Sequence, residues 1–305
     1  MGHPVCNSSP RTQHRIMKVA VTGATGFIGR HVLSELVRHG IAAVAVVRSP
    51  ACANLRVPDV EIAQLDLERS PDDAFELMGK PDVLIHLAWG GLPNYRSLKH
   101  FEHELPIQYR FLSGLIRSGL GGLVVTGTCF EYGMQSGELR ETLTASPENP
   151  YGFAKDTLRR QLEYLRSVHP FAFTWARLFY LYGEGQAENS LLPQLKRAVE
   201  QGQPIFNMSG GEQLRDYLSV GEVAKNLVAL ALYKADIGVV NICSGKPISV
   251  RDLVESWIKE NGWTIDLNLG YYPYPDYEPL AFWGNREKLN TFLELTRKNT
   301  LAPDC

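Results

Sequence analysis

The segment that most constrains the fold is a glycine-rich turn over residues 22–29, which reads TGATGFIG. A short apolar run at residues 18–22 leads into this turn, and residues 28–39 then repeat apolar side chains at helical spacing. Residues 41–47 form a second apolar run, as in a strand that is buried on both faces of a sheet. A strand, a helix and a second strand within about thirty residues predict a parallel βαβ unit.

The alternation of strands and helices continues along the first part of the chain. Strands are expected at residues 60–65, 82–87, 122–126 and 172–178, and helices at residues 71–78, 101–118 and 150–168. Strands that are regularly separated by helices predict an α/β fold with a doubly wound parallel sheet of the Rossmann type. Beyond residue 180 the pattern loosens, and we predict a helix at residues 191–201 and a short strand at residues 239–242.

The glycines of the turn fall at the spacing G-x-x-G-x-x-G, and each has its own physical task. Gly23 permits the tight turn, Gly26 lets the backbone approach a pyrophosphate, and Gly29 allows the helix to lie close to the strand. Phe27 and Ile28 open the helix, whose N-terminal amides and dipole attract an anion. Because a βαβ unit encloses the turn, the sequence predicts a dinucleotide site; the alternative is a purely structural tight turn.

These patterns divide the chain into three parts. Residues 1–16 contain no apolar stretch of the kind found in secretory signals, and we expect a disordered extension or a tag. We expect residues 17–178 to form the dinucleotide-binding Rossmann domain, with return segments near residues 216–245. We expect residues 179–305 to form mainly a smaller C-terminal substrate-binding lobe.

Composition excludes several classes of partner. A formal net charge of −2 argues against nucleic-acid binding, and no stretch approaches the ~20 apolar residues that span a bilayer. The five cysteines are scattered, with no C-x-x-C pair, which favours reduced thiols in a cytoplasmic protein over disulfides or a zinc site. We therefore expect a cytoplasmic protein with no bound metal, no nucleic-acid partner and no membrane partner.

The end of the second predicted strand bears on the choice between NAD and NADP. An NAD site usually places an acidic residue there to accept from the ribose 2′-hydroxyl, whereas an arginine accommodates a 2′-phosphate. This chain has Val47 followed by Arg48, so the sequence favours NADP(H) over NAD(H). The alternative is that Arg48 is a solvated surface residue.

Two further strand ends are expected beside the cofactor. Asp66 and Leu67 follow the third predicted strand, where a carboxylate can accept from the adenine amino group. An ordinary helix N-cap explains Asp66 almost as well. Leu87, Ala88 and Trp89 end the fourth predicted strand, where small apolar residues normally pass beside the cofactor.

A tyrosine and a lysine stand at i and i+4 at the start of a predicted helix. Tyr151 and Lys155 follow a turn with two prolines, so the phenol and the ammonium lie on one helical face. A nearby cation lowers the pKa of a phenol, which can then exchange a proton with a substrate oxygen near neutral pH. Upstream, Thr128 lies in the loop GTCFEYG and can hydrogen-bond the same oxygen. Without the other motifs, Thr128 would be interpreted as a structural residue at a strand end.

From residue 17 onward, the order and spacing of these motifs resemble the extended short-chain dehydrogenases/reductases of the NAD-dependent epimerase/dehydratase family. The resemblance implies that Thr128 and Tyr151 hold the substrate oxygen and move its proton. It implies that Lys155 binds the nicotinamide ribose and lowers the phenol pKa, while hydride passes between nicotinamide and a sugar carbon. It also implies a homodimer formed through the helices at residues 101–118 and 150–168.

The resemblance extends to the second half of the chain and implies contacts with a sugar-nucleotide substrate. Phe179 belongs to the segment beside the nicotinamide, and Tyr180 stands where an asparagine is usual. Asn189 matches a backbone contact to the sugar nucleotide. Arg215 matches an arginine that binds the substrate diphosphate, since a guanidinium offers a charge-assisted partner to that anion. The alternative for Arg215 is a surface ion pair with Asp216.

The residues after Thr128 discriminate between the reactions of the family. Similar 4,6-dehydratases carry Asp-Glu where this chain has Cys129 and Phe130, which cannot supply an acid and a base. Related 3,5-epimerising reductases carry a cysteine one position later, so we expect Cys129 to be a packed thiol. The chain looks most like reductases of nucleotide-linked 4-keto-6-deoxyhexoses, with Tyr151 as proton donor. The alternative is an NAD-dependent sugar-nucleotide 4-epimerase; a 4,6-dehydratase or a non-catalytic nucleotide-binding protein is less favoured.

Overall fold

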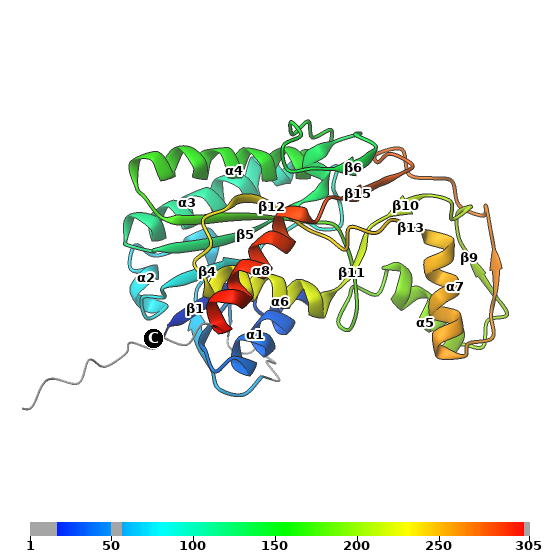
Figure 1. Cartoon of the computed structure of the whole chain (residues 1–305), viewed down its shortest axis with the longest axis horizontal. Coiled ribbons are helices and arrows are strands. Elements are labelled where there is room, and N and C mark those ends of the chain that lie inside the picture. The colour runs from blue at the N-terminus through cyan, green and yellow to red at the C-terminus, as the bar shows by residue number, and fades with distance from the viewer. Residues whose placement is uncertain (1–16, 50–56, 302–305) are drawn as a thin grey trace, which may run out of the picture.

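The computed structural model describes residues 17–49 and 57–301, so the expected extension at residues 1–16 lies outside the described residues. A seven-stranded parallel sheet forms the centre of the larger part (Figure 1). In spatial order its strands are β12 (Gly238–Ile242), β7 (Ala172–Leu178), β5 (Gly122–Thr128), β4 (Val83–His86), β1 (Lys18–Thr22), β2 (Ala42–Val47) and β3 (Val60–Gln64). The order reverses beside β1, as in a doubly wound Rossmann sheet, which confirms the predicted fold class.

Helices cover both faces of this sheet (Figure 1). One face carries α1 (Phe27–Arg38), α6 (Val220–Leu232) and α8 (Glu287–Leu301). The other face carries α2 (Ala74–Leu77), α3 (Leu105–Arg117) and α4 (Pro150–Val168). Successive residues of the central strands point to opposite faces, so Val19 and Val21 join one core while Ala20 joins the other.

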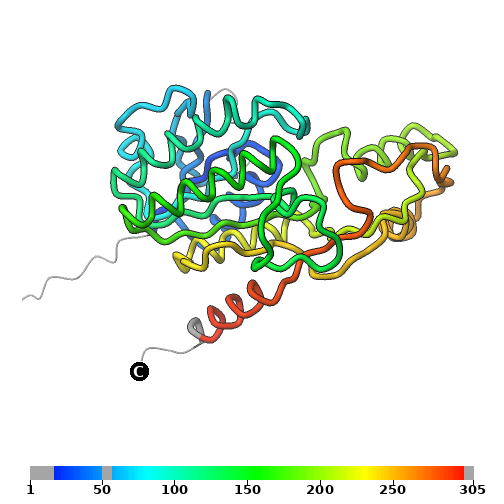
Figure 2. The backbone as a smooth tube through the Cα atoms, turned by 90° about the horizontal axis from the view of Figure 1, so that it is seen from above, coloured from blue at the N-terminus to red at the C-terminus, as the bar shows by residue number. Residues whose placement is uncertain are grey.

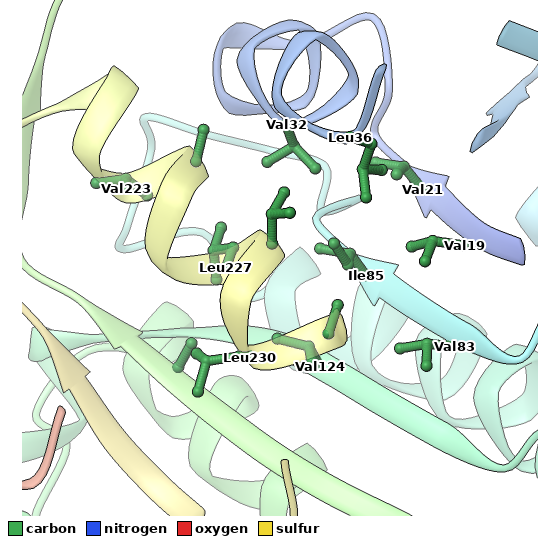
Figure 3. Packing of buried hydrophobic residues seen from close by; sticks show 14 of the residues in the cluster. Val19, Val21, Val32, Leu36, Val83, Ile85, Val124, Val223, Leu227 and Leu230 are labelled. Atoms are coloured by element: carbon green, nitrogen blue, oxygen red, sulfur yellow. The ribbon is translucent and has the colours of Figure 1, made fainter. Parts of the chain in front are cut away.

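The core beneath α1 and α6 shows why these two helices lie together on the sheet. Val32 and Leu36 of α1 and Leu227 of α6 are fully buried against Val21 and Ile85 of the central strands (Figure 3). α6 therefore returns a segment from beyond residue 215 to the face of the sheet that carries α1.

Most predicted elements agree closely with the structure, and two differ. The helix expected at residues 71–78 is shortened to α2, which ends before Gly79 at a positive φ of 70°. The helix expected at residues 101–118 begins as a π-helical turn, η3 (His100–Glu104), before α3. Among the described residues, no helix has both the length and the apolar character needed to cross a bilayer.

A smaller lobe extends from one end of the sheet (Figure 2). It is built from α5 (Leu191–Glu200), α7 (Val250–Asn261), and the strand pairs β9 (Ile205–Asn207) with β14 (Asp266–Asn268) and β10 (Leu214–Arg215) with β13 (Ile248–Ser249). Its own core contains Leu195, Phe206, Val254 and Trp257.

Short elements join the lobe to the sheet and shape the space between them. These are β8 (Tyr180–Tyr182) with β11 (Tyr217–Ser219), β6 (Gly137–Leu139) with β15 (Phe282–Gly284), and the 3-10 turn η4 (Cys129–Tyr132). A further 3-10 turn, η2 (Leu67–Arg69), follows the edge strand β3. In the parallel β8–β11 pair, Tyr180 lies opposite Tyr217. Segments far apart in the sequence thus meet above the carboxyl ends of β5 and β7.

Candidate active site

The glycine turn has a backbone shape that other residues would not permit. Gly23 has φ +65°, and a Cβ there would lie 2.9 Å from the backbone nitrogen of Ala88. A Cβ on Gly29 would overlap the carbonyl oxygen of Gly23. The turn is therefore held tightly between the start of α1 and the end of β4, as the spacing predicted.

The N-terminus of α1 fits the pyrophosphate of a dinucleotide. Its N-cap is Gly26, and within the described residues no side chain caps it and no acidic residue stands in its first turn. By contrast, Asn149, Ser219 and Ser249 cap the backbone amides of α4, α6 and α7. The amides of α1 and its helix dipole thus remain available to an anion.

A buried hydrogen-bond cluster, which sequence analysis missed, fixes the end of β4 beside this turn. The Thr22 hydroxyl accepts from the backbone nitrogens of Leu87 (3.2 Å) and Ala88 (3.4 Å) and lies 2.8 Å from His86 Nδ1. Because the two lone pairs of the hydroxyl accept from these backbone nitrogens, its proton is donated to His86 Nδ1. Burial, with Lys155 nearby, lowers the pKa of His86 to about 3, so His86 is neutral.

Further predicted cofactor residues lie just after the outer strands β2 and β3. Arg48 is exposed at the end of β2, and the residues that follow it from position 50 to 56 lie outside the described residues. Asp66 accepts from the Glu68 backbone nitrogen at 3.2 Å and so acts as the N-cap of η2, with Leu67 as the first residue of that turn. The alternative interpretation of Asp66 as a helix cap therefore describes its contact in the structure.

The first turn of α4 brings the tyrosine and the lysine to the end of β5. The Asn149 side chain caps α4 by accepting from the Gly152 backbone nitrogen at 2.8 Å. A Cβ on Gly152 would lie 2.6 Å from the Phe130 carbonyl oxygen, so η4 contacts α4 closely. Lys155 Nζ donates to the Thr126 carbonyl oxygen at 2.9 Å and lies 5.9 Å from the centre of the Tyr151 ring.

Burial governs the titration of this pair. The pKa of Tyr151 is raised, because burial disfavours the phenolate and Tyr95 and Glu131 add to the effect, while the Thr128 hydroxyl opposes it. Burial lowers the pKa of Lys155 to about 7, against the opposing influence of Glu131 and Glu104. The expected lowering of the phenol pKa is therefore not found here, because burial outweighs the lowering effect of the Thr128 hydrogen bond.

A buried carboxylate holds the loop that carries Thr128. Glu131 is fully buried, and its Oε1 accepts from the Thr128 backbone nitrogen (2.9 Å) and from Trp175 Nε1 (2.9 Å). Its Oε2 accepts from Arg177 Nε at 2.6 Å, and Arg177 is 2% exposed. Sequence analysis missed this residue, although Thr-x-x-Glu is the spacing of a capping box.

Cys129 is a buried thiol packed among aromatic side chains. The thiol is buried in a small cluster with Tyr132, Phe179 and Phe282. Burial, reinforced by the Glu278 carboxylate, raises its pKa and disfavours the thiolate. The structure therefore agrees with the expectation of a packed thiol.

A cavity of about 930 Å³ runs from the start of α1 to the lobe. It brings together many of the predicted site residues: Phe27, Ile28, Leu87, Thr128, Tyr151, Lys155, Phe179, Tyr180 and Asn189. Its volume falls in the range that holds sizeable organic ligands. The predicted hydroxyl, phenol and ammonium thus share one cavity with the start of the glycine-turn helix.

Aromatic rings close the cavity beside the Tyr151 hydroxyl. The ring of Tyr95 lies 4.8 Å from that of Phe130 and 5.6 Å from that of Tyr151. Tyr277, from the loop after β14, lies 6.2 Å from Phe130. The neighbouring Arg96 is engaged in an ion pair with Asp276, so this wall presents mainly ring surface.

Arg215 does not line the cavity. Its guanidinium is 2% exposed, forms an ion pair with Glu278 at 2.8 Å and lies 4.6 Å from the Phe282 ring. Tyr180 donates to the other oxygen of Glu278. The alternative of a surface ion pair with Asp216 is wrong, because Asp216 is buried and accepts from the backbone nitrogens of Ser244, Gly245 and Gly284.

Comparison with known proteins identifies the family of the chain. The sequence model of the NAD dependent epimerase/dehydratase family matches residues 19–243. The chain is 30% identical to dTDP-6-deoxy-L-talose 4-dehydrogenase (NAD(+)) of Aggregatibacter actinomycetemcomitans, over 88% of this chain and 99% of that protein. It is 26% identical to CDP-abequose synthase of Salmonella typhimurium, over 77% of this chain and 78% of that protein.

Solved structures show the same architecture. MoeE5 in complex with UDP-glucuronic acid and NAD superposes with a TM-score of 0.76 at 26% identity, covering 91% of this chain and 92% of MoeE5. That likeness spans both the sheet and the lobe.

Proposed function

Because this chain belongs to the NAD-dependent epimerase/dehydratase family, we propose that it reduces the 4-keto group of a nucleotide-linked 4-keto-6-deoxyhexose. At the coarser level, the chain is an enzyme of a family that modifies sugar nucleotides. The relatives named as a 6-deoxytalose 4-dehydrogenase and an abequose synthase support the finer assignment. The product would be a nucleotide-linked 6-deoxysugar.

The observation that carries this proposal is the buried, protonated phenol of Tyr151 in the cavity. Reduction of a ketone adds a hydride to carbon and a proton to oxygen. A phenol whose pKa is raised by burial is still protonated at neutral pH and can donate that proton. Thr128, at the end of β5 in the same cavity, is the second hydrogen-bonding group for the keto oxygen.

The chain's own residues then have separate tasks. Thr128 and Tyr151 orient the keto oxygen, and Tyr151 transfers its proton to the alkoxide that forms. The ammonium of Lys155 stabilises the resulting phenolate until a proton is recovered from solvent. The backbone of the glycine turn at Gly26 and the first amides of α1 would hold the cofactor's pyrophosphate, and a bound reduced nicotinamide would supply the hydride.

The aromatic wall supports a deoxysugar. In a hexose linked to a diphosphate through C1, the C4 carbonyl lies at the opposite end of the ring, and C5 beside it carries C6. Tyr95, Phe130 and Tyr277 cover the space next to Tyr151 with ring surface. Such a surface suits a C6 methyl group better than a hydroxymethyl or carboxylate group, which would lose its hydration.

The test is a reduction assay with purified protein, NADPH or NADH, and a panel of nucleotide-linked 4-keto-6-deoxyhexoses. We expect substrate-dependent loss of the absorbance of the reduced nicotinamide. Failure to consume either reductant, together with NAD released when the protein is denatured, would instead favour a sugar-nucleotide 4-epimerase. That alternative uses the same tyrosine and lysine but returns the hydride to the sugar.

The cofactor preference is a separate proposal that depends on Arg48. MoeE5 is solved with NAD, and the talose dehydrogenase relative carries NAD(+) in its name. We nevertheless propose NADP(H) over NAD(H), because Arg48 is exposed at the end of β2 and can pair with a 2′-phosphate.

Replacing Arg48 with serine is expected to lower the kcat/KM ratio for NADPH over NADH by about tenfold or more, since a charge-assisted hydrogen bond contributes about 1.5–3 kcal/mol. Steady-state kinetics with both reductants measures the ratio. Arg38→Ser, at the exposed end of α1, is the matched control and should leave the ratio unchanged. An unchanged ratio in Arg48→Ser would show that Arg48 does not recognise a 2′-phosphate, and a wild-type ratio below one would contradict the NADP(H) assignment.

The two parts of the chain have different ligands in this proposal. We propose that residues 17–178 with the return segments near 216–245 bind the cofactor, and that residues 179–305 mainly bind the sugar nucleotide. Asn189 and Tyr180 line the cavity on the lobe side, whereas Arg215 would need to leave Glu278 to reach a diphosphate.

We also propose a cytoplasmic homodimer joined through α3 and α4; Tyr164 on α4 is 79% exposed.

A further inference from the structure

Trp89 is a large aromatic residue at a strand end where small apolar residues normally pass beside the cofactor. It follows β4, and its indole lines the cavity. The ammonium nitrogen of Lys155 lies 4.1 Å from the centre of its ring. A cation over the face of an indole is attracted by the ring quadrupole, more strongly when both groups are shielded from water.

Two hydrogen bonds fix the plane of this indole. Trp89 Nε1 donates to His100 Nδ1 at 3.1 Å, and His100 Nε2 lies 2.8 Å from the Asn94 carbonyl oxygen. An indole can only donate and a carbonyl can only accept, so His100 is neutral with its proton on Nε2. His100 is fully buried in η3, and its ring lies 5.2 Å from that of Tyr151.

Lys155 has few other partners for its charge. Among residues 17–49 and 57–301 it forms no ion pair, and its hydrogen bond is to the neutral carbonyl of Thr126. Glu131 and Glu104 act only through longer-range electrostatics, and His86 beneath it is neutral. Tyr151 on the same helix is protonated. The indole face is therefore a principal stabiliser of the charged amine.

We propose that Trp89, held by His100, is a positioning residue that keeps Lys155 protonated and aligned behind Tyr151. This inference rests on the proposed role of the Tyr151–Lys155 pair in proton transfer. Two distant segments, the loop after β4 and the first turn of α4, would then be coupled through one aromatic face.

The charge of Lys155 decides in which direction the loss of the Trp89 ring moves the lysine pKa. The indole face stabilises the protonated amine, so its loss makes Lys155 give up its proton at lower pH. The charged form is the one that stabilises the phenolate of Tyr151. Removal of the ring should therefore move the high-pH decline of kcat/KM to lower pH.

The experiment compares Trp89→Leu, Trp89→Phe and the control Trp263→Leu, which removes an indole from the lobe. NMR of the cofactor-free protein labelled with 13C at lysine Cε follows the titration of Lys155, and Lys155→Met assigns its signal. We expect Trp89→Leu to lower the pKa of Lys155 by about 0.4 to 1.5 units. Trp89→Phe should lower it less, because a ring face remains, and Trp263→Leu should not change it.

Two outcomes are decisive. A Lys155 pKa that is unchanged or raised in folded Trp89→Leu and Trp89→Phe would overturn the proposal, even if activity fell, because the indole would then not stabilise the charged amine. A shifted titration in a protein that shows no ketoreductase activity would support the proposal and contradict the proposed function. The titration needs no substrate, so the two failures are distinguishable.

Discussion

Tyr151→Phe is expected to lower kcat/KM for the 4-keto sugar nucleotide by about 10²- to 10⁴-fold, the range for loss of a positioned general acid. Phenylalanine keeps the ring contacts with Tyr95, Trp89 and His100 and removes only the proton donor. Steady-state kinetics measures the loss, and thermal unfolding checks that the fold is retained. We expect kcat to carry most of the effect, because the proton is transferred after binding.

A second tyrosine on the same helix provides the control. Tyr164 of α4 is 79% exposed and lies outside the cavity, so Tyr164→Phe should leave the kinetics unchanged. If Tyr151→Phe kept more than a tenth of the wild-type rate, another group would have to supply the proton. Tyr95 would then be the first residue to test, since its ring is nearest to that of Tyr151 among the tyrosine rings of the cavity wall.

The first half of the fold could be predicted because its signals are local. Strands buried on both faces are apolar runs, and the intervening helices repeat apolar residues at helical spacing. The α4 boundaries, Pro150–Val168, agree with the prediction because Asn149 supplies the N-cap and Pro150 suits the first turn. The helix predicted at residues 101–118 covers η3 and α3 together, and its π-helical start at His100–Glu104 has no simple sequence signature.

The second half depends on partners that are distant in the sequence. α6 is missing from the prediction because it packs beside α1 against the sheet, and so many of its residues are apolar that no clear polar face stands out. The pairs β8–β11 and β6–β15 are only three residues long, and each joins segments far apart in the chain. Short strands of this kind carry too few residues to show a period.

The site residues, too, could be predicted where their signal is local and not where their partners are distant in the sequence. Thr128, Tyr151 and Lys155 stand in recognisable local motifs, and the structure brings them to one cavity. Trp89 could not be assigned a role, because its partners His100 and Lys155 come from other segments. The ion pair of Arg215 with Glu278 likewise joins β10 to the loop before β15. A partner so distant in the sequence cannot be inferred from the residues next to Arg215.

Glu131 is the residue for which we expect the largest effect on stability. Its carboxylate is fully buried with Arg177, which is 2% exposed. Glu131→Ala would leave that guanidinium with only the longer ion pair to Asp156 at 4.0 Å, and would leave the Trp175 and Thr128 nitrogens without their acceptor. Breaking a buried ion pair from one side costs about 3–5 kcal/mol of unfolding free energy. Urea unfolding at equilibrium measures this cost.

A surface carboxylate on α4 provides the control for the general effect of removing a negative charge. Glu163 is 41% exposed and pairs with Arg159, so Glu163→Ala should cost less than about 1 kcal/mol. Replacing both Glu131 and Arg177 with apolar residues should recover part of the loss, because no buried charge remains unpaired. A loss for Glu131→Ala as small as that for Glu163→Ala would show that the buried pair does not hold the loop. The position of Thr128 would then have to depend on the β5–β7 ladder, in which Thr128 lies opposite Leu178.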